Sequence, residues 1–358
     1  MVYAVIAILC FGILIATHEA GHMFAAKACG VKVNEYAIGM GPALWSKQKG
    51  ETKYSLRLFP VGGYCAIEGE SGESDDPRSL CSQSVLKQIF VFSAGVLVNF
   101  LTGFLILVFI YAGADSLITP EIVSLRDGFP YAGEAGIMAG DTIKEINGSP
   151  VYLYSDISVI LMATDTGPNG RISMIVERDG ELLERQLEQT TYTEADGSET
   201  VAYGFAYGGV TPATLDMKLK YTFLNTIDFV RLVGFNFKII AKGAASMNDL
   251  RGPVGIVSEI TKMGNEAEAT SGFADAFMDV LYYVAMIAIN LAVMNLLPIP
   301  ALDGGHIVVL LLDTAVMKLF SRRISQKAIN AVTLGSFALV LLLMLVISYK
   351  DIMRLLPL

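Results

Sequence analysis

Four runs of the chain are apolar and contain no Asp, Glu, Lys, Arg or His: residues 1–17, 88–114, 280–302 and 328–349. Each run approaches or exceeds the roughly 17–25 residues that a helix needs to cross a bilayer. The pattern of hydrophobic positions therefore predicts four transmembrane helices. We expect a polytopic α-helical membrane protein.

The segment between the first two runs, residues 27–86, has a different pattern. Residues 51–59 (ETKYSLRLF) alternate between apolar and polar side chains, as a half-buried strand does. A second apolar stretch, 36–45, precedes them, and Gln48-Lys49-Gly50 is a plausible turn between the two. We predict a membrane-associated β-hairpin or small sheet here, followed by an acidic, solvated loop at 68–78.

A polar domain is predicted after the second span, at residues 115–210. Its sequence 131–151 (YAGEAGIMAGDTIKEINGSPV) suggests a short helix at 133–137, a strand at 142–146 and then an Asn147-Gly148 turn, which is a strong hairpin signal. We further expect a helix at 155–163 and strands at 171–178 and 181–189. The A-G-I-x-x-G-D-x-I-x-x-I-N-G run resembles a PDZ domain, and another small β-rich domain is the alternative.

The connector at 211–275 contains apolar residues that recur from 219 to 241, with charges at Asp228, Arg231 and Lys238. This spacing is typical of an amphipathic helix that lies on the outer membrane surface. A simple connector without a role of its own is the alternative.

The composition supports these assignments. Only 17% of the residues are charged and 53% are hydrophobic, against about 25% charged in ordinary soluble proteins. The net charge of −9 gives no basic surface for a nucleic acid, so no nucleic-acid partner is expected. The four cysteines form no C-x-x-C pair, which excludes a disulfide framework. The first run lacks a basic start and an A-x-A site, so we expect a retained helix rather than a signal peptide.

Lysines and arginines gather in the loop between the first two spans and in the loop at 318–327. By the positive-inside rule, both loops are cytoplasmic and the PDZ-like domain is extracytoplasmic. The expected location is the inner or plasma membrane, with multiple passes. The predicted boundaries are 1–26 for span one, 27–86 for the hairpin loop, 87–114 for span two, 115–210 for the PDZ-like domain, 211–275 for the amphipathic connector, 276–320 for span three and 328–349 for span four.

The chain has three histidines, and two of them form the H-E-x-x-H motif of His18, Glu19 and His22. Side chains four residues apart lie on one face of a helix, so two imidazoles can bind one Zn²⁺ while the glutamate reaches its water. The motif lies near the end of an apolar helix, where ionisable groups are costly and usually have a partner. A zinc-dependent catalytic site is therefore predicted.

A catalytic zinc takes a third protein ligand. Asp303 closes the otherwise uncharged third run and is expected at the same depth as His18. Pro298 and Pro300 would break the helix and let the backbone bend toward the metal. His306 is the competing ligand, but we favour Asp303.

In the order of its motifs, the chain resembles the site-2 protease family of intramembrane zinc metalloproteases, in its bacterial RseP/RasP-type branch with one PDZ domain. His18-Glu19-x-x-His22 is followed far downstream by N-x-x-P-x-P-x-x-D-G-G, which runs from Asn295 to Gly305. Val96 stands where the family commonly has proline. The other matching segments are Gly39-Met40-Gly41-Pro42, Pro60-Val61-Gly62-Gly63-Tyr64, Ala94-Gly95-Val96-Leu97-Val98-Asn99-Phe100 and Arg251-Gly252-Pro253-Val254-Gly255-Ile256.

The resemblance implies a zinc metalloendopeptidase of regulated intramembrane proteolysis. It would cut transmembrane segments after a first extracytoplasmic cleavage, with anti-sigma factors and remnant signal peptides as family substrates. His18, His22 and Asp303 would be the zinc ligands, Glu19 the general base, and Asn295 a contact for substrate or oxyanion. For Asn295, helix packing is the alternative.

A substrate helix must unwind before its peptide bonds can be attacked. We hypothesise that an exposed strand edge at 54–58 or 60–64 pairs with the unwound segment. The alternative is a hairpin that only plugs the cavity. Two other functions fit part of the pattern: a zinc-handling membrane transporter, which leaves Glu19 without a task, and a PDZ-bearing membrane scaffold, which needs no complete H-E-x-x-H.

Overall fold

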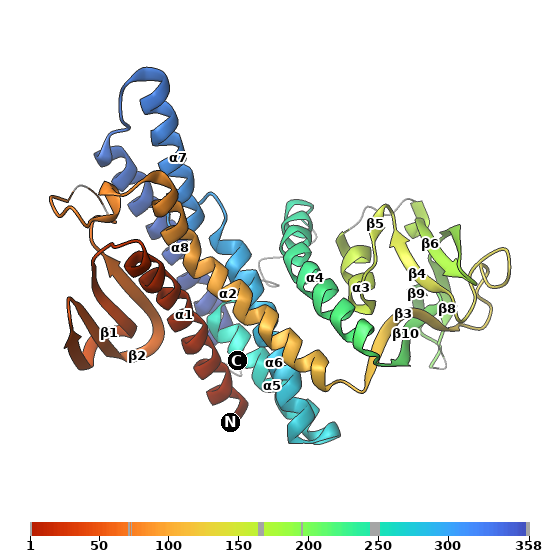
Figure 1. Ribbon diagram of the computed structural model, residues 1–358. Coiled ribbons are helices and arrows are strands. Elements are labelled where there is room, and N and C mark those ends of the chain that lie inside the picture. The colour runs from red at the N-terminus through yellow and green to blue at the C-terminus, as the bar shows by residue number, and fades with distance from the viewer. Residues whose placement is uncertain are drawn as a thin grey trace. The chain divides into compact units, whose positions relative to one another are not determined.

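The computed structural model describes residues 2–70, 72, 74–163, 168–194, 196–243 and 251–355 (Figure 1). Ser71 and Glu73 of the predicted acidic loop lie outside the described residues. The chain forms two compact units. Unit one contains residues 1–106 and 246–358, and unit two contains residues 107–245.

Unit one is built mainly of helices. Its helices are α1 (Val2–Ala28), α2 (Val85–Gly113), which continues into unit two, α5 (Pro253–Ser271), α6 (Phe273–Asn295), α7 (Asp303–Phe320) and α8 (Gln326–Leu355), with the short η1 (Leu80–Ser82). Four of them, α1, α2, α6 and α8, are long and apolar enough to cross a membrane. The four predicted transmembrane helices are therefore present.

The predicted third span, 276–320, is divided in two. Helix α6 ends at Asn295 and α7 begins at Asp303. The intervening residues include Pro298 and Pro300, which cannot donate a backbone hydrogen bond to a continuing helix. The predicted break is therefore confirmed, and a new helix begins after it at Asp303.

Small residues let the helices of unit one approach closely. A Cβ atom on Gly21 of α1 would lie 2.7 Å from the Ala94 carbonyl oxygen of α2, and a Cβ atom on Gly103 of α2 would lie 2.8 Å from the Ala285 carbonyl oxygen of α6. Such positions are common where membrane helices pack, because lipid supplies no hydrophobic force between helices. Buried apolar side chains fill the space between α1, α5 and α6: Tyr3, Ala7, Leu14, Ile260, Ala276, Val280, Val284 and Ala288.

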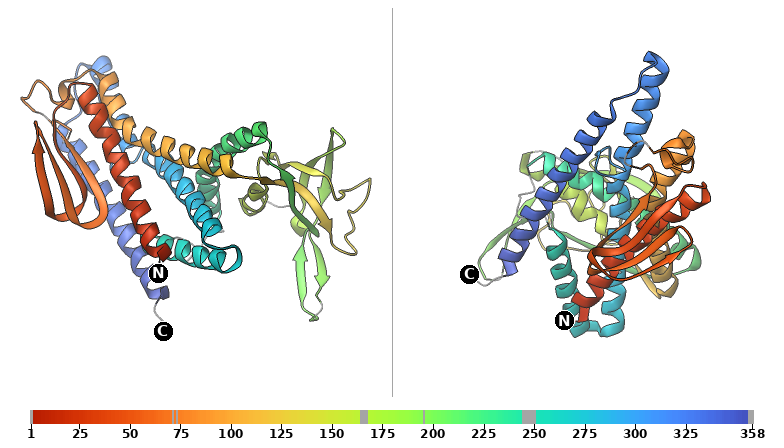
Figure 2. Two further views of the ribbon diagram at one scale, coloured as in Figure 1. Left: turned by 60° about the horizontal axis from the view of Figure 1, so that its bottom comes forward. Right: turned by 90° about the vertical axis from the view of Figure 1, so that its left-hand side faces the viewer.

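The predicted hairpin is confirmed as β1 (Val33–Lys49) and β2 (Thr52–Ile67), which lie beside α1 (Figure 2). Both strands bend, so the first part of β1 pairs twice: Ala37 pairs with Tyr64 and also with Ser55. The second part of β1 pairs only with the first part of β2. The resulting order of segments is 43–49, 52–57, 33–38 and 63–67, and among the described residues the last of these has a strand partner on one side only.

A partly buried polar group holds the bent hairpin together. Arg57 donates to Glu35 at 2.9 Å and to the Gly41 carbonyl oxygen at 2.7 Å, and Ser55 donates to Glu35 at 2.7 Å. Burial pushes the pKa of Glu35 upward, but the hydrogen bonds from Ser55 and Arg57 outweigh it and hold this pKa at about 2. Glu35 is therefore ionised at neutral pH and links two strand segments and a bend.

The hairpin is fixed to α1. The Tyr36 hydroxyl donates to the Ala16 carbonyl oxygen at 2.8 Å. Apolar side chains of both elements share one buried cluster, which includes Met23 and Ala26 of α1, Val33 of β1 and Cys65 of β2. This packing places the end of β2 beside the helix that carries the H-E-x-x-H motif.

Unit two contains a six-stranded sheet in the order β10-β3-β4-β6-β7, with β5 paired to β4, and a separate β8–β9 hairpin. The strands are β3 (Ser116–Leu125), β4 (Thr142–Ile146), β5 (Ser149–Pro150), β6 (Ile172–Arg178), β7 (Glu181–Leu187), β8 (Thr190–Thr193), β9 (Glu199–Ala202) and β10 (Phe205–Pro212), and the helices are α3 (Tyr154–Ala163), η2 (Pro168–Gly170) and α4 (Leu215–Ala241). The core of the unit lies between the sheet, α3 and the end of α4.

Most local predictions for this unit are confirmed, and one is wrong. The Asn147-Gly148 turn has φ values of 47° and 76° and joins β4 to β5. No helix forms at 133–137. Instead Gly133 adopts φ 109°, and Ile137 donates to the Tyr131 carbonyl oxygen at 2.9 Å. The chain turns back on itself so tightly that a side chain on Gly136 would overlap Tyr131.

Helix α4 lies along α3 (Figure 1). Arg231 donates to the Pro150 carbonyl oxygen at 2.8 Å, and Lys242 donates to the Ala163 carbonyl oxygen at the other end of α3, also at 2.8 Å. Burial and the neighbouring Asp156 carboxyl raise the pKa of Asp228 above its usual range. The predicted helix at 219–241 is confirmed, and its place on the membrane surface stays a prediction.

One carboxylate ties α8 to α5. Asp351 is 2% exposed, and its Oδ2 atom accepts hydrogen bonds from the backbone N–H groups of Gly252 and Gly255, both at 2.8 Å. These N–H groups lie at the N-terminus of α5, where no intrahelical acceptor exists and negative charge is favourable. The Arg-Gly-Pro-Val-Gly-Ile segment thus forms the start of α5, and Asp351 of α8 caps this start.

We expect Asp351→Ala to destabilise the protein by about 1–3 kcal/mol, because two buried N–H groups lose their acceptor. The midpoint of thermal unfolding in detergent measures this effect. Glu266→Ala, at an exposed acid on α5, is the control and should leave the midpoint unchanged. Equal midpoints for Asp351→Ala and the wild type would show that the cap contributes nothing.

Candidate active site

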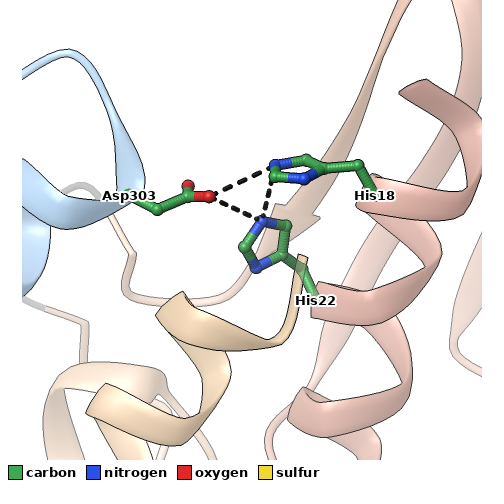
Figure 3. Close-up of side chains that lie close together, drawn as sticks. All are labelled: His18, His22 and Asp303. Carbon is green, nitrogen blue, oxygen red and sulfur yellow. Dashed lines mark hydrogen bonds and ion pairs between the residues drawn. The ribbon is translucent and has the colours of Figure 1, made fainter. Parts of the chain in front are cut away.

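His18 and His22 lie on one face of α1, as the spacing predicts (Figure 3). Both residues are 8% exposed, and their Nε2 atoms are 3.3 Å apart. The rings stand edge to face, at 83° to one another. Two nitrogen atoms therefore converge on one point beside the helix.

Asp303 comes to the same point from the first turn of α7. Its Oδ2 atom lies 3.2 Å from Nε2 of His18 and 3.5 Å from Nε2 of His22 (Figure 3). Gly304 and Gly305 make this possible, because a side chain on either would overlap the backbone at 296–300. The Asp-Gly-Gly sequence lets α7 start directly against the loop that follows α6.

The three ligand atoms fit a zinc ion. In a tetrahedral site with bonds of about 2.0–2.1 Å, neighbouring ligand atoms lie about 3.3 Å apart. The three distances here are 3.2, 3.3 and 3.5 Å. Among the described residues, these three alone form a group of metal-binding side chains with convergent atoms. The group offers three protein ligands, which leaves one tetrahedral position open.

The rings are oriented from α2. Nδ1 of His22 lies 2.8 Å from the Val91 carbonyl oxygen and therefore donates its proton to that oxygen, so Nε2 is the nitrogen that can bind a metal. Nδ1 of His18 lies 3.3 Å from the side-chain amide of Asn99. A side chain at Gly95 would occupy the space of both rings. The sequence had singled out the segment that contains Gly95 and Asn99, but not Val91, and it had assigned these residues no role.

Glu19 lies between the histidines and the hairpin. Its Cγ atom lies 3.6 Å from the position that a Cβ on Gly63 would take, and its carboxylate accepts a hydrogen bond from the Cys65 backbone. Glu19 therefore lies next to the two histidines in sequence and beside the strand segment 63–67, which has a strand partner on one side only among the described residues.

Two other predicted residues lie outside the cluster. His306 stacks on Phe92 of α2, with ring centroids 5.2 Å apart at 16°. The structure therefore brings Asp303, rather than the competing His306, to the two imidazoles. Asn295 is the last residue of α6 and is not among the convergent ligands.

The chain matches the model of peptidase family M50 over residues 6–343. It belongs to this family. A protein of Clostridium acetobutylicum that is named as a zinc metalloprotease is 33% identical over 97% of this chain and 96% of its own length. A second protein with this name, from Clostridium perfringens, is 32% identical over 98% of both chains. The regulator of sigma-W protease RasP of Bacillus subtilis is 27% identical over 97% of both chains.

Membership of family M50 decides between the functions that the sequence left open. The protein is a zinc metalloendopeptidase of the site-2 protease family and an integral membrane protein. The transporter and scaffold alternatives are therefore set aside. The roles of single residues are carried by the geometry above and stay predictions.

We expect His18→Ala, His22→Ala and Asp303→Ala each to lose most of their bound zinc, because a three-ligand site that loses one ligand holds the ion weakly. Zinc per mole of purified protein, measured by mass spectrometry, checks this. His306→Ala is the matched control and should keep its zinc. Zinc loss in His306→Ala together with zinc retention in Asp303→Ala would reverse the assignment of the third ligand.

Proposed function

We propose that this M50 peptidase hydrolyses peptide bonds within transmembrane segments of membrane proteins that another protease has already trimmed outside the membrane. The observation that carries the proposal is the position of the cluster: His18 and His22 lie on the apolar span α1, and Asp303 begins the helix after span α6. The name of the RasP relative supports membrane-bound anti-sigma factors as one substrate class. Remnant signal peptides are the other class.

His18, His22 and Asp303 would hold the zinc ion. Zinc bound there supplies Lewis-acid chemistry, which activates water and polarises a carbonyl group. Glu19 would accept the proton of the attacking water and pass it to the leaving amine. Asn295 would contact the substrate backbone or the developing oxyanion.

We place the active site toward the cytoplasmic side and unit two outside. The basic loops at 27–87 and 318–327 support this orientation through the positive-inside rule. We assign residues 115–210 of unit two, in which strands β4, β6 and β7 and helix α3 match the predicted order, as a PDZ-like domain.

The bent hairpin supports a specific way to hold the unwound substrate. Of the two segments predicted from the sequence, 60–64 is favoured, because its residues Gly63 and Tyr64 belong to the segment 63–67, which pairs only with 33–38 among the described strands. The segment 54–58 is disfavoured, because Leu56 pairs with Ile38 on one side and with Trp45 on the other. A strand added beside 63–67 would lie next to Glu19.

We expect Glu19→Gln to bind zinc like the wild type and to cleave a transmembrane reporter peptide at least about 100-fold more slowly, since a general base contributes about 10²–10⁴-fold. Cleavage in detergent and bound zinc are measured on the same preparations. Glu51→Gln, at the exposed hairpin turn, is the control for loss of an acid.

The two measurements separate the possible outcomes for Glu19. A zinc-loaded Glu19→Gln protein that cuts at the wild-type rate would remove Glu19 as the base. Loss of zinc in this variant would instead make Glu19 a structural part of the metal site.

Strand pairing can be tested on the substrate. We expect N-methylation of single peptide bonds near the cleavage site to slow cleavage at every second position, because alternate N–H groups of a strand face its partner. The rates for a series of synthetic transmembrane peptides, each methylated at one position, measure this period. Unmethylated peptide and methylation far from the cut are the controls. A uniform loss, or none, would contradict pairing.

A further inference from the structure

We propose that Asn99 is the positioning residue for His18: its side-chain oxygen accepts the proton of His18 Nδ1 and thereby leaves Nε2 free to bind zinc. This inference rests on the proposed function, because it takes His18 to be a zinc ligand. It gives a role to the Ala94–Phe100 segment of α2, which the sequence had marked and the catalytic assignment had not used.

The contact between Asn99 and His18 is buried and within hydrogen-bond distance. Asn99 is 0% exposed, and its amide lies 3.3 Å from Nδ1 of His18. His18 itself is 8% exposed. Asn99 Oδ1, as oriented, is buried with no hydrogen-bond partner. A buried amide oxygen without a donor is costly, since it has given up its hydrogen bonds with water.

The position of the His18 proton decides which way the amide must point. Nε2 of His18 faces Asp303 and His22, so it must be unprotonated when a metal is bound. The ring proton then lies on Nδ1, and an amide NH₂ group facing it would place two donors against each other. The two orientations of an Asn amide nearly coincide in shape, so the side chain can turn and present Oδ1 to Nδ1–H.

The backbone of α2 does the same for the second histidine. The Val91 carbonyl oxygen accepts from His22, and Gly95 between them leaves room for both rings. Val91, Gly95 and Asn99 are spaced four residues apart and so follow one face of α2. Helices α1 and α2 run in opposite directions here, so the earlier residue of α2, Val91, meets the later histidine, His22, and Asn99 meets His18. Helix α2 thus contacts the Nδ1 atom of both imidazoles.

The alternative is that Asn99 only packs two helices together, as interior amides of membrane bundles often do. Asn290 of α6 offers a matched case. Its Oδ1 atom is also buried without a hydrogen-bond partner, and it lies outside the group of convergent ligands. A packing role predicts similar consequences for the two residues, whereas a positioning role predicts an effect on metal binding for Asn99 alone.

The test uses the full chain in detergent, stripped of metal and titrated with Zn²⁺ against a chromophoric chelator, and with Co²⁺ alone for its visible absorption. We expect Asn99→Leu, which has nearly the same shape and no acceptor, to weaken Zn²⁺ binding about 10–100-fold, as loss of an outer hydrogen bond to a metal-bound histidine does. Its Co²⁺ spectrum should also change. Asn99→Asp keeps an acceptor at the same place and should bind Zn²⁺ at least as tightly as the wild type.

Asn290→Leu should match the wild type in both titrations. Wild-type affinity and an unchanged Co²⁺ spectrum in Asn99→Leu would overturn the inference. If Asn99→Leu does not fold, Asn99→Asp decides alone: binding weakened tenfold or more would mean that the amide N–H is the group His18 needs.

His18→Ala in the same titration separates this inference from the proposed function. If His18→Ala keeps its metal, the ligand assignment itself is wrong. If His18→Ala loses its metal and Asn99→Leu does not, only the role of Asn99 fails.

Discussion

The candidate site depends on how closely α1 and α2 approach each other. Gly21 of α1 lies against the Ala94 carbonyl of α2, and Gly95 of α2 lies against the two imidazoles of α1. A methyl group at either position would push the helices apart. The Val91 carbonyl would then move away from His22, and Asn99 from His18. The geometry of the proposed metal ligands is therefore set first by the absence of two side chains, and only then by the ligands themselves.

The close approach of α1 and α2 also offsets the cost of placing polar groups among apolar helices. Imidazole and carboxylate groups among apolar helices lose their hydration and must find partners within the protein. Here each histidine has a partner at both ring nitrogens, with α2 on one side and the carboxylate of Asp303 on the other. The Oδ2 atom of Asp303 is buried without a hydrogen-bond partner and faces both imidazoles, so a cation held among the three side chains would satisfy it. The same group can then serve a metal without reorganising, since Nε2 of each ring already faces the others.

The sequence could predict the features that depend on one element at a time. His18, Glu19 and His22 share one helix face, so their spacing was enough. Asp303 was found because it ends an uncharged run, and the break after Asn295 because prolines cannot continue a helix. Val91, Gly95 and Asn99 could not be assigned in this way, since the face that α2 turns to α1 depends on the packing of two helices. The double pairing of Ala37 likewise depends on contacts far apart in the sequence. The helix expected at 133–137 failed because two glycines there allow a tighter turn than a helix.

Helix α1 carries or anchors most of the groups that the proposed chemistry needs. It carries the proposed ligands His18 and His22 and the proposed base Glu19, and it receives the Tyr36 hydroxyl that fixes the hairpin. The proposed position of a substrate strand beside Gly63 and the position of the proposed base are therefore set by the same helix. A base that must reach a water within hydrogen-bond distance tolerates little movement. Placing the base, two ligands and the anchor of the substrate edge within two turns of one helix keeps their separations fixed even if α7 or the hairpin tip moves. The remaining freedom lies with Asp303, the one ligand that α1 does not carry, and the two glycines that follow it hold it against the end of α6.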